Sequence, residues 1–361
     1  MYKFLFFPHV PYHVNTFVPI IKELGNHNAS IIYSDHLKYY GRGEILESQI
    51  KEIADENNIL SVPYTPQIFG RERPDALIVM NDWGGWPKRA VEDAKKRNIP
   101  TIGHIEGAQD YLDTHLEHGY PGERRYPYKK VDYVFLLGEY DKHFFKTQKT
   151  KVIGSPRFDG FLNQTKKSVE QANKLVGINC NFSYGLYADI AKQWIDDIVE
   201  TTESLPVKYK ISQHIGDVTD LSGLNIFGDD LYDLIKASSV FVSRFSTAII
   251  EALLLGCPSI YYNPHKEMQP TFLDAMGGFP TATNKNELRE ALIDVFSNGE
   301  NWLNQAEKFL DFHVANKDGR SAKVFANELI EIAKDKRKTN YHLPIRSYIK
   351  YILESITLKF K

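Results

Sequence analysis

The sequence is poor in cysteine, in net charge and in long apolar segments, and each shortage excludes a class of protein. Its 361 residues include only two cysteines, Cys180 and Cys257, which lie in apolar runs without the spacing of zinc ligands. We therefore expect buried thiols in a reducing compartment. A net charge of −2 argues against a dedicated nucleic-acid-binding protein. No run reaches the roughly 18 apolar residues needed to span a membrane.

Several motifs that hold cofactors or nucleophiles are also missing. There is no G-x-x-x-x-G-K-[ST] phosphate loop, which disfavours ATP or GTP hydrolysis. No G-x-G-x-x-G follows the first strand, which disfavours NAD and FAD. The G-x-S-x-G turn of serine hydrolases is absent as well. We expect no resident cofactor and no metal site.

Apolar strands do alternate with amphipathic helices along the whole chain. This pattern predicts an α/β fold built from parallel βαβ units. The length allows two domains, each with its own core. A Gly- and Pro-containing stretch, 154–160, marks a boundary between them. The predicted organisation is two α/β domains and a tail, with the bounds 1–160, 161–333 and 334–361.

The segment Val240–Tyr262 is the most informative part of the chain. It reads as a buried strand, a polar turn, a helix, a Gly-Pro stop and a second buried strand. The turn carries four polar residues: Ser243, Arg244, Ser246 and Thr247. Amide groups and the positive end of the dipole at such a helix start favour an anion, so the turn predicts a phosphate site. Glu251, one turn further on, could accept from sugar hydroxyls, although the hydroxyl residues could equally be ordinary helix caps.

Other polar residues could complete a nucleotide site in the second domain. Ser183 follows the first strand of that domain, and His214 ends a later one. Arg157, in the linker, could neutralise phosphate, or it could form a structural pair with Asp159. Because the carboxyl ends of parallel strands meet at one sheet edge, these residues can share a ligand.

Four residues of the first half are candidates for acid–base chemistry. His13 lies on the loop between the first strand and first helix, where a near-neutral pKa suits a general base. His9 is a weaker candidate on the same loop. His104 and Glu106 follow another buried strand and alternate with Ile105, so both can face one side. A histidine–glutamate pair that only braces the loop is the alternative.

The last 28 residues differ from the rest. Residues 334–361 contain eight Lys or Arg and two acidic residues, a net charge of 8 − 2 = +6. Apolar residues recur there at roughly helical spacing, which is typical of a helix lying on an anionic membrane surface. The alternative is a terminal helix that packs on the first domain.

Five motifs in order resemble the GT-B superfamily of glycosyltransferases. The resemblance is to the branch with CDP-glycerol glycerophosphotransferases, capsule polysaccharide transferases and UDP-GlcNAc 2-epimerases. It covers roughly residues 1–333. The motifs are His13–Pro19, His104–Gly107, Gly154–Asp159, Ser243–Pro258 and Asp318–Ser321. One departure is that Lys210 and His214 occur without the family's following proline.

The resemblance implies two Rossmann-like domains, the first binding an acceptor and the second a nucleotide-activated donor. It implies base-assisted, metal-independent transfer of a sugar or polyol phosphate to a cell-surface glycan or lipid-linked acceptor. We expect a cytoplasmic protein that contacts the inner membrane face. A UDP-sugar 2-epimerase and a non-catalytic GT-B scaffold subunit remain alternatives.

Overall fold

The computed structural model describes most of the chain. The described residues are 1–25, 27–34, 45–82, 85–105, 107–108, 128–146, 148–162, 174–182, 187–214, 217–228, 230–335, 339–341, 349 and 352–353. Their strands form two sheets in which every neighbouring pair is parallel. In each sheet, the loops that follow the strands therefore meet at one edge.

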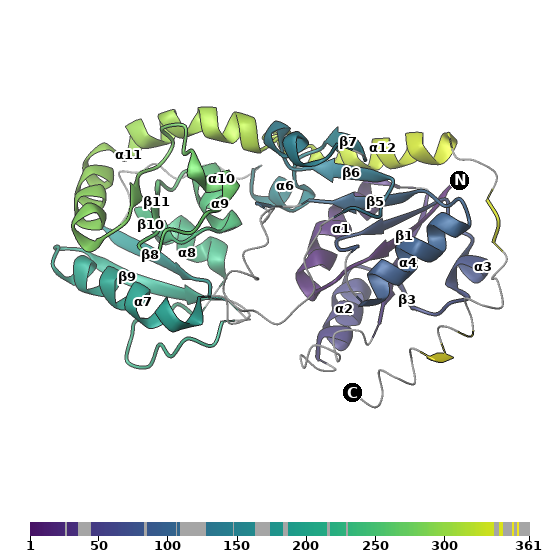
Figure 1. The fold of residues 1–361 in the computed structure, drawn as a ribbon, viewed down its shortest axis with the longest axis horizontal. Coiled ribbons are helices and arrows are strands. Elements are labelled where there is room, and N and C mark those ends of the chain that lie inside the picture. The colour runs from purple at the N-terminus through teal and green to yellow at the C-terminus, as the bar shows by residue number, and fades with distance from the viewer. Residues whose placement is uncertain are drawn as a thin grey trace. The chain divides into compact units, whose positions relative to one another are not determined.

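The first sheet has seven strands in the order β3-β2-β1-β4-β5-β6-β7 (Figure 1). Its strands are β1 Lys3–Phe7, β2 Asn28–Tyr33, β3 Leu60–Pro63, β4 Ala76–Val79, β5 Thr101–His104, β6 Tyr133–Leu136 and β7 Lys149–Val152. The elements between and after them are α1 Pro11–Glu23, α2 Ile45–Glu56, α3 Ile68–Glu72, α4 Gly85–Lys96, η2 Glu139–Phe144 and α6 Pro156–Leu162.

The two faces of this sheet are covered by different helices. Phe4 and Phe6 of β1 belong to a core with α1, α2 and the late helix α12, Ser321–Lys334. Phe7 points to the other face because side chains alternate along a strand. Its ring lies 5.3 Å from that of Tyr64, which lies 5.7 Å from Trp86 at the start of α4. Both faces are therefore buried, as in other parallel sheets.

The second sheet has five strands in the order β12-β11-β10-β8-β9. Its strands are β8 Leu175–Cys180, β9 Lys208–Gln213, β10 Val240–Ser243, β11 Ser259–Tyr262 and β12 Thr281–Ala282. Its helices are α7 Ala188–Glu203, α8 Leu231–Ala237, α9 Thr247–Leu254, α10 Pro270–Leu273 and α11 Lys285–His313. Helices α7 and α11 share a core with one face, and α8 and α9 cover the other. Cys180 and Cys257 are buried free thiols, as predicted.

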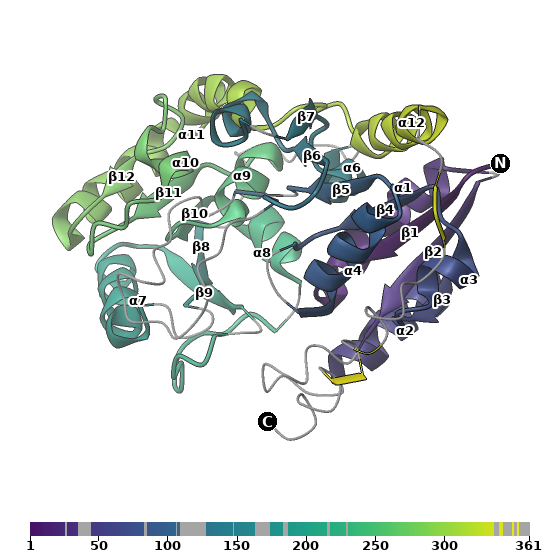
Figure 2. The same cartoon turned by 45° about the vertical axis from the view of Figure 1, so that its right-hand side comes forward.

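The chain forms two compact units, and each unit is built from segments that are not contiguous in the sequence. Unit 1 comprises Met1–Glu106, Arg125–Gly160 and Ala315–Lys361, and unit 2 comprises Gly107–Arg124 and Phe161–Val314. One division lies between Gly160 and Phe161, and α12 belongs with unit 1. The domain bounds 1–160, 161–333 and 334–361 stay a prediction. Figure 2 shows α12, in yellow, beside the purple and blue elements of that unit.

Two sequence motifs explain why α12 joins unit 1. The Asp159 carboxylate accepts from the amides of Ser321 (3.1 Å) and Ala322 (2.7 Å), which start α12. Gly154 has a left-handed φ of +82°, and a side chain there would lie 2.3 Å from the Ala315 carbonyl oxygen. The motifs 154–159 and 318–321 therefore contact each other and together attach α12 to unit 1.

Apolar runs in the sequence predict ten strands, at 3–7, 29–33, 76–80, 101–104, 133–137, 151–153, 174–179, 207–212, 240–242 and 259–262, and each is present within two residues of these bounds. The pattern does not predict β3 and β12, which lie at the edges of the two sheets. It predicts a helix over 285–296, whereas α11 continues to His313 through a kink at Asn298. None of the helices among the described residues is long and apolar enough to cross a bilayer.

We expect the replacement Asp159→Ala to destabilise unit 1 by about 1–2 kcal/mol, because the first amides of α12 lose their acceptor. Urea unfolding followed by circular dichroism measures the change. Asp318→Ala is the matched control, because this exposed carboxylate contacts Arg320 within the same turn, so that its loss should leave the unfolding midpoint unchanged. An Asp159→Ala protein as stable as wild type would contradict this capping role.

Candidate functional site

Each sheet has one point where the strand order reverses. In unit 2, the chain runs from β8 outwards to β9 and then returns to β10 on the other side of β8. In unit 1, it runs from β1 outwards through β2 to β3 and returns to β4 beside β1. Open α/β sheets bind ligands outside the carboxyl ends of the strands at such points. The loops after β8, β10, β1 and β4 are therefore the candidate ligand-binding loops.

The β10–α9 turn of unit 2 contains the predicted phosphate-site hydroxyls. Ser246 is the N-cap of α9, and its Oγ accepts from the Ala248 amide at 3.2 Å. Thr247 Oγ1 accepts from the Ala108 amide at 3.0 Å, and both residues belong to unit 2. Both hydroxyl side chains are partly exposed. Each hydroxyl retains a proton to donate, so both can contribute to an anion site.

Ser243 has a different place from the one predicted. It is fully buried at the end of β10, and its Oγ accepts from the Asn179 side chain of β8 at 3.0 Å. This bond joins the two strands that flank the switch point. Ser243 therefore holds the loops together and is not exposed to a ligand in this structure.

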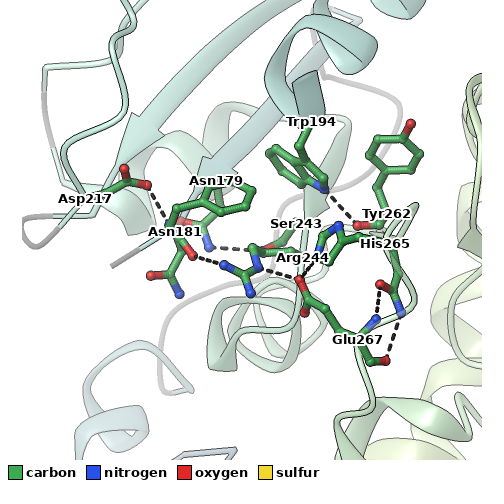
Figure 3. A network of polar contacts seen from close by, with 11 residues as sticks. Asn179, Asn181, Trp194, Asp217, Ser243, Arg244, Tyr262, His265 and Glu267 are labelled. Atoms are coloured by element: carbon green, nitrogen blue, oxygen red, sulfur yellow. Dashed lines mark hydrogen bonds and ion pairs between the residues drawn. The ribbon is translucent and has the colours of Figure 1, made fainter. Parts of the chain in front are cut away.

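Arg244 is also buried, with 1% of its surface exposed. Its Nε donates to Glu267 Oε1 at 2.7 Å and its Nη1 to the Asn181 carbonyl at 3.0 Å (Figure 3). The guanidinium lies 4.5–4.8 Å from three aromatic ring centres, those of Phe182, Tyr187 and Phe245. Glu267 therefore neutralises the charge of Arg244 in this structure, and a role of Arg244 at a phosphate stays a prediction.

Glu267 and His265 are functional candidates that the sequence prediction missed. They follow β11, and the Asn263 side chain fixes Glu267 by bonding its amide at 2.7 Å and its carbonyl at 3.1 Å. Figure 3 shows the His265 ring directed at the Glu267 carboxylate, which it contacts through Nε2. The rule that polar residues after a buried parallel strand mark the ligand edge, applied to β11, would have found them.

The remaining candidates of unit 2 differ in their surroundings. Glu251 is almost fully buried, and its Oε1 accepts from the Tyr232 hydroxyl at 3.1 Å, so it faces α8 rather than solvent. His214 lies just after β9, partly exposed, and its carbonyl accepts from the Asp217 amide at 2.8 Å. Asp217 accepts in turn from the Phe182 amide at 2.6 Å, which ties the loop after β9 to the loop after β8. Ser183 lies outside the described residues.

In unit 1, His13 caps the start of α1. Its Nδ1 accepts from the amide of His9 at 3.0 Å and more weakly from that of Val10 at 3.4 Å. Burial lowers its pKa to about 3, with a further contribution from the positive charge of Arg157. The neutral ring therefore carries its proton on Nε2. This arrangement favours a hydrogen-bond donor over the predicted general base.

Arg157 and His13 lie close enough for their charges to interact within unit 1, although they come from the first turns of two helices, α6 and α1, that are far apart in the sequence. His9, next to His13, contacts Asn81 through Nδ1 at 3.1 Å. Asn81 follows β4, so this bond spans the switch point of unit 1. The structure thus brings His9, His13 and Arg157 into one polar group.

His104 does not join this group. It is fully buried on β5, its Nδ1 lies 3.3 Å from the Phe135 carbonyl oxygen, and its ring packs 5.1 Å from that of Phe325. The alternation along β5 directs the ring into the core, and a catalytic role of His104 stays a prediction. Glu106 lies outside the described residues.

Asp82, at the end of β4, has a bracing role. Burial raises the pKa of this carboxyl, although the amides of Lys130 (2.5 Å), Tyr128 (2.6 Å) and Val131 (3.2 Å) donate to it and oppose the shift. It therefore fixes the segment that leads into β6. Within the described ranges, no three His, Cys, Asp or Glu side chains gather as metal ligands.

Comparison with solved structures identifies the fold. The chain is similar to the UDP-GlcNAc 2-epimerase of Methanocaldococcus jannaschii, solved with UDP-GlcNAc and UDP, at a TM-score of 0.64 and 15% identity over 91% of this chain and 99% of the epimerase. It is similar to the wall teichoic acid polymerase TagF, solved with CDPG, at 0.55 and 12% identity, covering 92% and 89%. A third match is the spinosyn forosaminyltransferase SpnP, at 0.59 and 10% identity, covering 92% and 100%.

These similarities define the class of fold. The protein has a GT-B fold of two Rossmann-like domains, as predicted, and UDP-GlcNAc 2-epimerases, TagF and a glycosyltransferase share it at low identity. At 10–15% identity, the similarity is one of fold. No protein-family model matches the sequence, and no curated protein matches it.

Because the pKa of His13 in the fold lies far below the ordinary histidine value of 6.5, the unfolded chain binds the extra proton between about pH 6.5 and 3. We therefore expect stability to be full above pH 6.5 and to fall as the pH decreases, with His13 contributing a loss of about 2 kcal/mol between pH 7 and 5. Urea unfolding at both values should show that His13→Gln, which retains a capping acceptor, removes this loss. His313→Gln is the corresponding variant in unit 2, because burial there lowers the pKa of His313 to about 4. An unchanged pH dependence in His13→Gln would contradict the buried neutral histidine.

The buried pair in unit 2 predicts a rescue experiment. Arg244→Met should destabilise the protein by about 3–5 kcal/mol, because Glu267 keeps a buried charge without its main partner. The double variant Arg244→Met/Glu267→Gln should recover most of that loss. Thermal unfolding measures both variants. The opposite pattern, a stable Arg244→Met protein with weakened nucleotide binding, would show that Arg244 is a ligand-binding group.

Proposed function

We propose that the protein is a transferase that moves a sugar or polyol phosphate from a nucleotide-activated donor to a cell-surface glycan or lipid-linked acceptor. The donor binds to unit 2 and the acceptor to unit 1. The observation that carries this proposal is the β10–α9 turn, which presents two partly exposed hydroxyls at a helix start beside a topological switch point. The similar structures support it, since two of them were solved with UDP-GlcNAc and with CDPG.

The turn suits the negative charge that forms on a departing nucleotide phosphate. The positive end of the α9 dipole and the first amides of the helix stabilise that charge. A phosphate oxygen can replace Ser246 Oγ as the acceptor for the Ala248 amide, while the Thr247 hydroxyl donates a second bond. No side chain needs to supply a positive charge there, which agrees with the neutralised state of Arg244.

In unit 1, His13 acts as a neutral donor from Nε2, and Arg157 supplies the positive charge beside it. These groups suit an anionic or strongly polar part of an acceptor, such as the phosphate of a lipid-linked glycan. His9, placed by Asn81, lies beside them. Proton removal from the acceptor hydroxyl falls to a group that is not identified among these three.

A UDP-sugar 2-epimerase is the second candidate, and the similarity to several epimerase structures favours it. The two activities differ in their products. An epimerase converts UDP-GlcNAc alone into its 2-epimer, whereas a transferase releases the nucleotide only when an acceptor is present. A scaffold subunit would bind nucleotide without turnover.

We expect one of CMP, CDP, UMP, UDP, GDP or ADP to raise the melting temperature without Mg²⁺. A ligand at 100 times its Kd stabilises a protein by about 2.7 kcal/mol, which gives a clear shift. Thr247→Val should weaken that nucleotide about tenfold, because it removes one donor to a charged phosphate. Thr202→Val is the matched control on α7, where the hydroxyl has no hydrogen-bond partner among the described residues. The absence of any shift in wild type would contradict the proposal.

The C-terminal tail suggests contact with a membrane. Its first part is anchored to unit 1, since the Asn340 amide donates to the Arg97 carbonyl (2.9 Å) and the Tyr341 hydroxyl to the Pro74 carbonyl (3.2 Å). Further along, Ile349 and Leu353 are exposed. Together with the +6 charge of residues 334–361, this pattern suits an anionic lipid surface.

We expect deletion of 342–361, which keeps the anchoring residues, to abolish binding to vesicles of phosphatidylglycerol and phosphatidylcholine. The apolar residues and half of the tail's basic residues are then missing. Vesicle sedimentation at low and high salt measures binding, and pure phosphatidylcholine vesicles serve as the control. Equal binding by the full-length and shortened proteins would contradict the membrane role.

A further inference from the structure

Around the Arg244–Glu267 ion pair, several buried polar atoms have no partner. Glu267 Oε2, His265 Nδ1 and the Tyr261 hydroxyl oxygen are all buried, and none has a hydrogen-bond partner in the described part of the chain. Buried polar atoms in native proteins are nearly always bonded, and exceptions often mark a bound water, ion or ligand. Three such atoms beside one ion pair therefore indicate a site rather than a packing feature.

These three residues belong to one neighbourhood at the carboxyl end of β11. His265 contacts Glu267 directly, and its ring lies 4.9 Å from that of Tyr187. The pKa of Tyr261 is raised first by burial and then by the negative charge of Glu267, so its hydroxyl lies within the electrostatic range of that carboxylate. Strand β11 pairs with β10, whose turn carries Ser246 and Thr247.

The hydrogen-bonding groups of Tyr261, His265 and Glu267 indicate which kind of ligand fits between them. Arg244 and Glu267 cancel each other's charge, so the group has no excess positive charge for a phosphate. Nε2 of His265 faces Glu267 Oε1, which only accepts, and in the tautomer with its proton on Nε2 the ring offers Nδ1 as an acceptor. Glu267 Oε2 is a second acceptor, and the Tyr261 hydroxyl can donate or accept. Two acceptors and a hydroxyl match a neutral group with hydroxyl donors.

We propose that Tyr261, His265 and Glu267 form a subsite for the hydroxyl groups of the donor, separate from the phosphate site at the start of α9. This inference rests on the proposed function and adds the part of the donor that unit 2 recognises. The hydroxyls belong either to the ribose or to the transferred sugar or polyol. Because the three polar atoms are buried, the segment 264–268 moves when the ligand enters.

Tyr261→Phe tests the subsite with little risk to the fold. It removes an oxygen that has no hydrogen-bond partner among the described residues, so the melting temperature should stay the same or rise. Affinity should fall roughly tenfold, as expected for one lost hydrogen bond to the ligand. Tyr262→Phe is the matched control on the same strand, because its hydroxyl donates to Asp197 at 2.7 Å. It should lower the melting temperature and leave the affinity unchanged.

Titration calorimetry with UDP, CDP, their 2′-deoxy forms, UDP-GlcNAc and CDP-glycerol identifies the source of the hydroxyls. If the subsite binds the 2′-hydroxyl of the ribose, Tyr261→Phe weakens the binding of UDP or CDP but not that of the 2′-deoxy forms. If it reads the transferred group, the variant weakens only UDP-GlcNAc or CDP-glycerol. His265→Ala should follow the same pattern.

Wild-type affinity of Tyr261→Phe and His265→Ala for every probe would overturn the subsite while leaving the donor site intact. Failure of the wild-type protein to bind any probe would instead overturn the proposed function, and the subsite with it. The two failures are therefore distinguishable.

Discussion

The buried contact between Arg244 and Glu267 is the constraint on which the ligand edge of unit 2 depends. It joins the turn after β10 to the segment after β11, and the bond from Arg244 to the Asn181 carbonyl adds the loop after β8. Two buried charges are stable together only if they are well paired. Removing either one destabilises the fold, because the other is left as a buried charge without a partner. The pair thus positions the loops around the start of α9, where we propose that an anion binds to amides and hydroxyls.

In unit 1, a buried carboxylate joins two segments that are distant in the sequence. Asp159 accepts the first amides of α12, and the apolar face of that helix completes the core under α1. A segment from the far end of the chain therefore becomes part of the first unit. The same unit holds His13 neutral by burial and by the charge of Arg157, so its polar group donates hydrogen bonds at any pH near neutrality.

The sequence predicted most of the fold because long apolar runs and Gly-Pro stops identify buried parallel strands. It missed β3 and β12, where short edge strands with half-exposed residues such as Leu60 and Thr281 have no such run. It also placed Arg244 at a phosphate, since Arg, Ser and Thr at a helix start suit an anion. Its ion-pair partner, Glu267, lies 23 residues further along the chain, and only folding brings the two residues together. His104 is a similar case, because its place in the core depends on a contact with Phe325 that the sequence does not indicate.

The central claim is that the amides at the start of α9 hold the phosphate of a nucleotide. Hydrogen–deuterium exchange measures those amides directly, with the nucleotide that stabilises the protein added at saturation. The account predicts slower exchange in peptides covering residues 245–250, together with slower exchange after β11 at residues 263–269. Protection confined to unit 1, or unchanged exchange at 245–250 under saturating nucleotide, would contradict it.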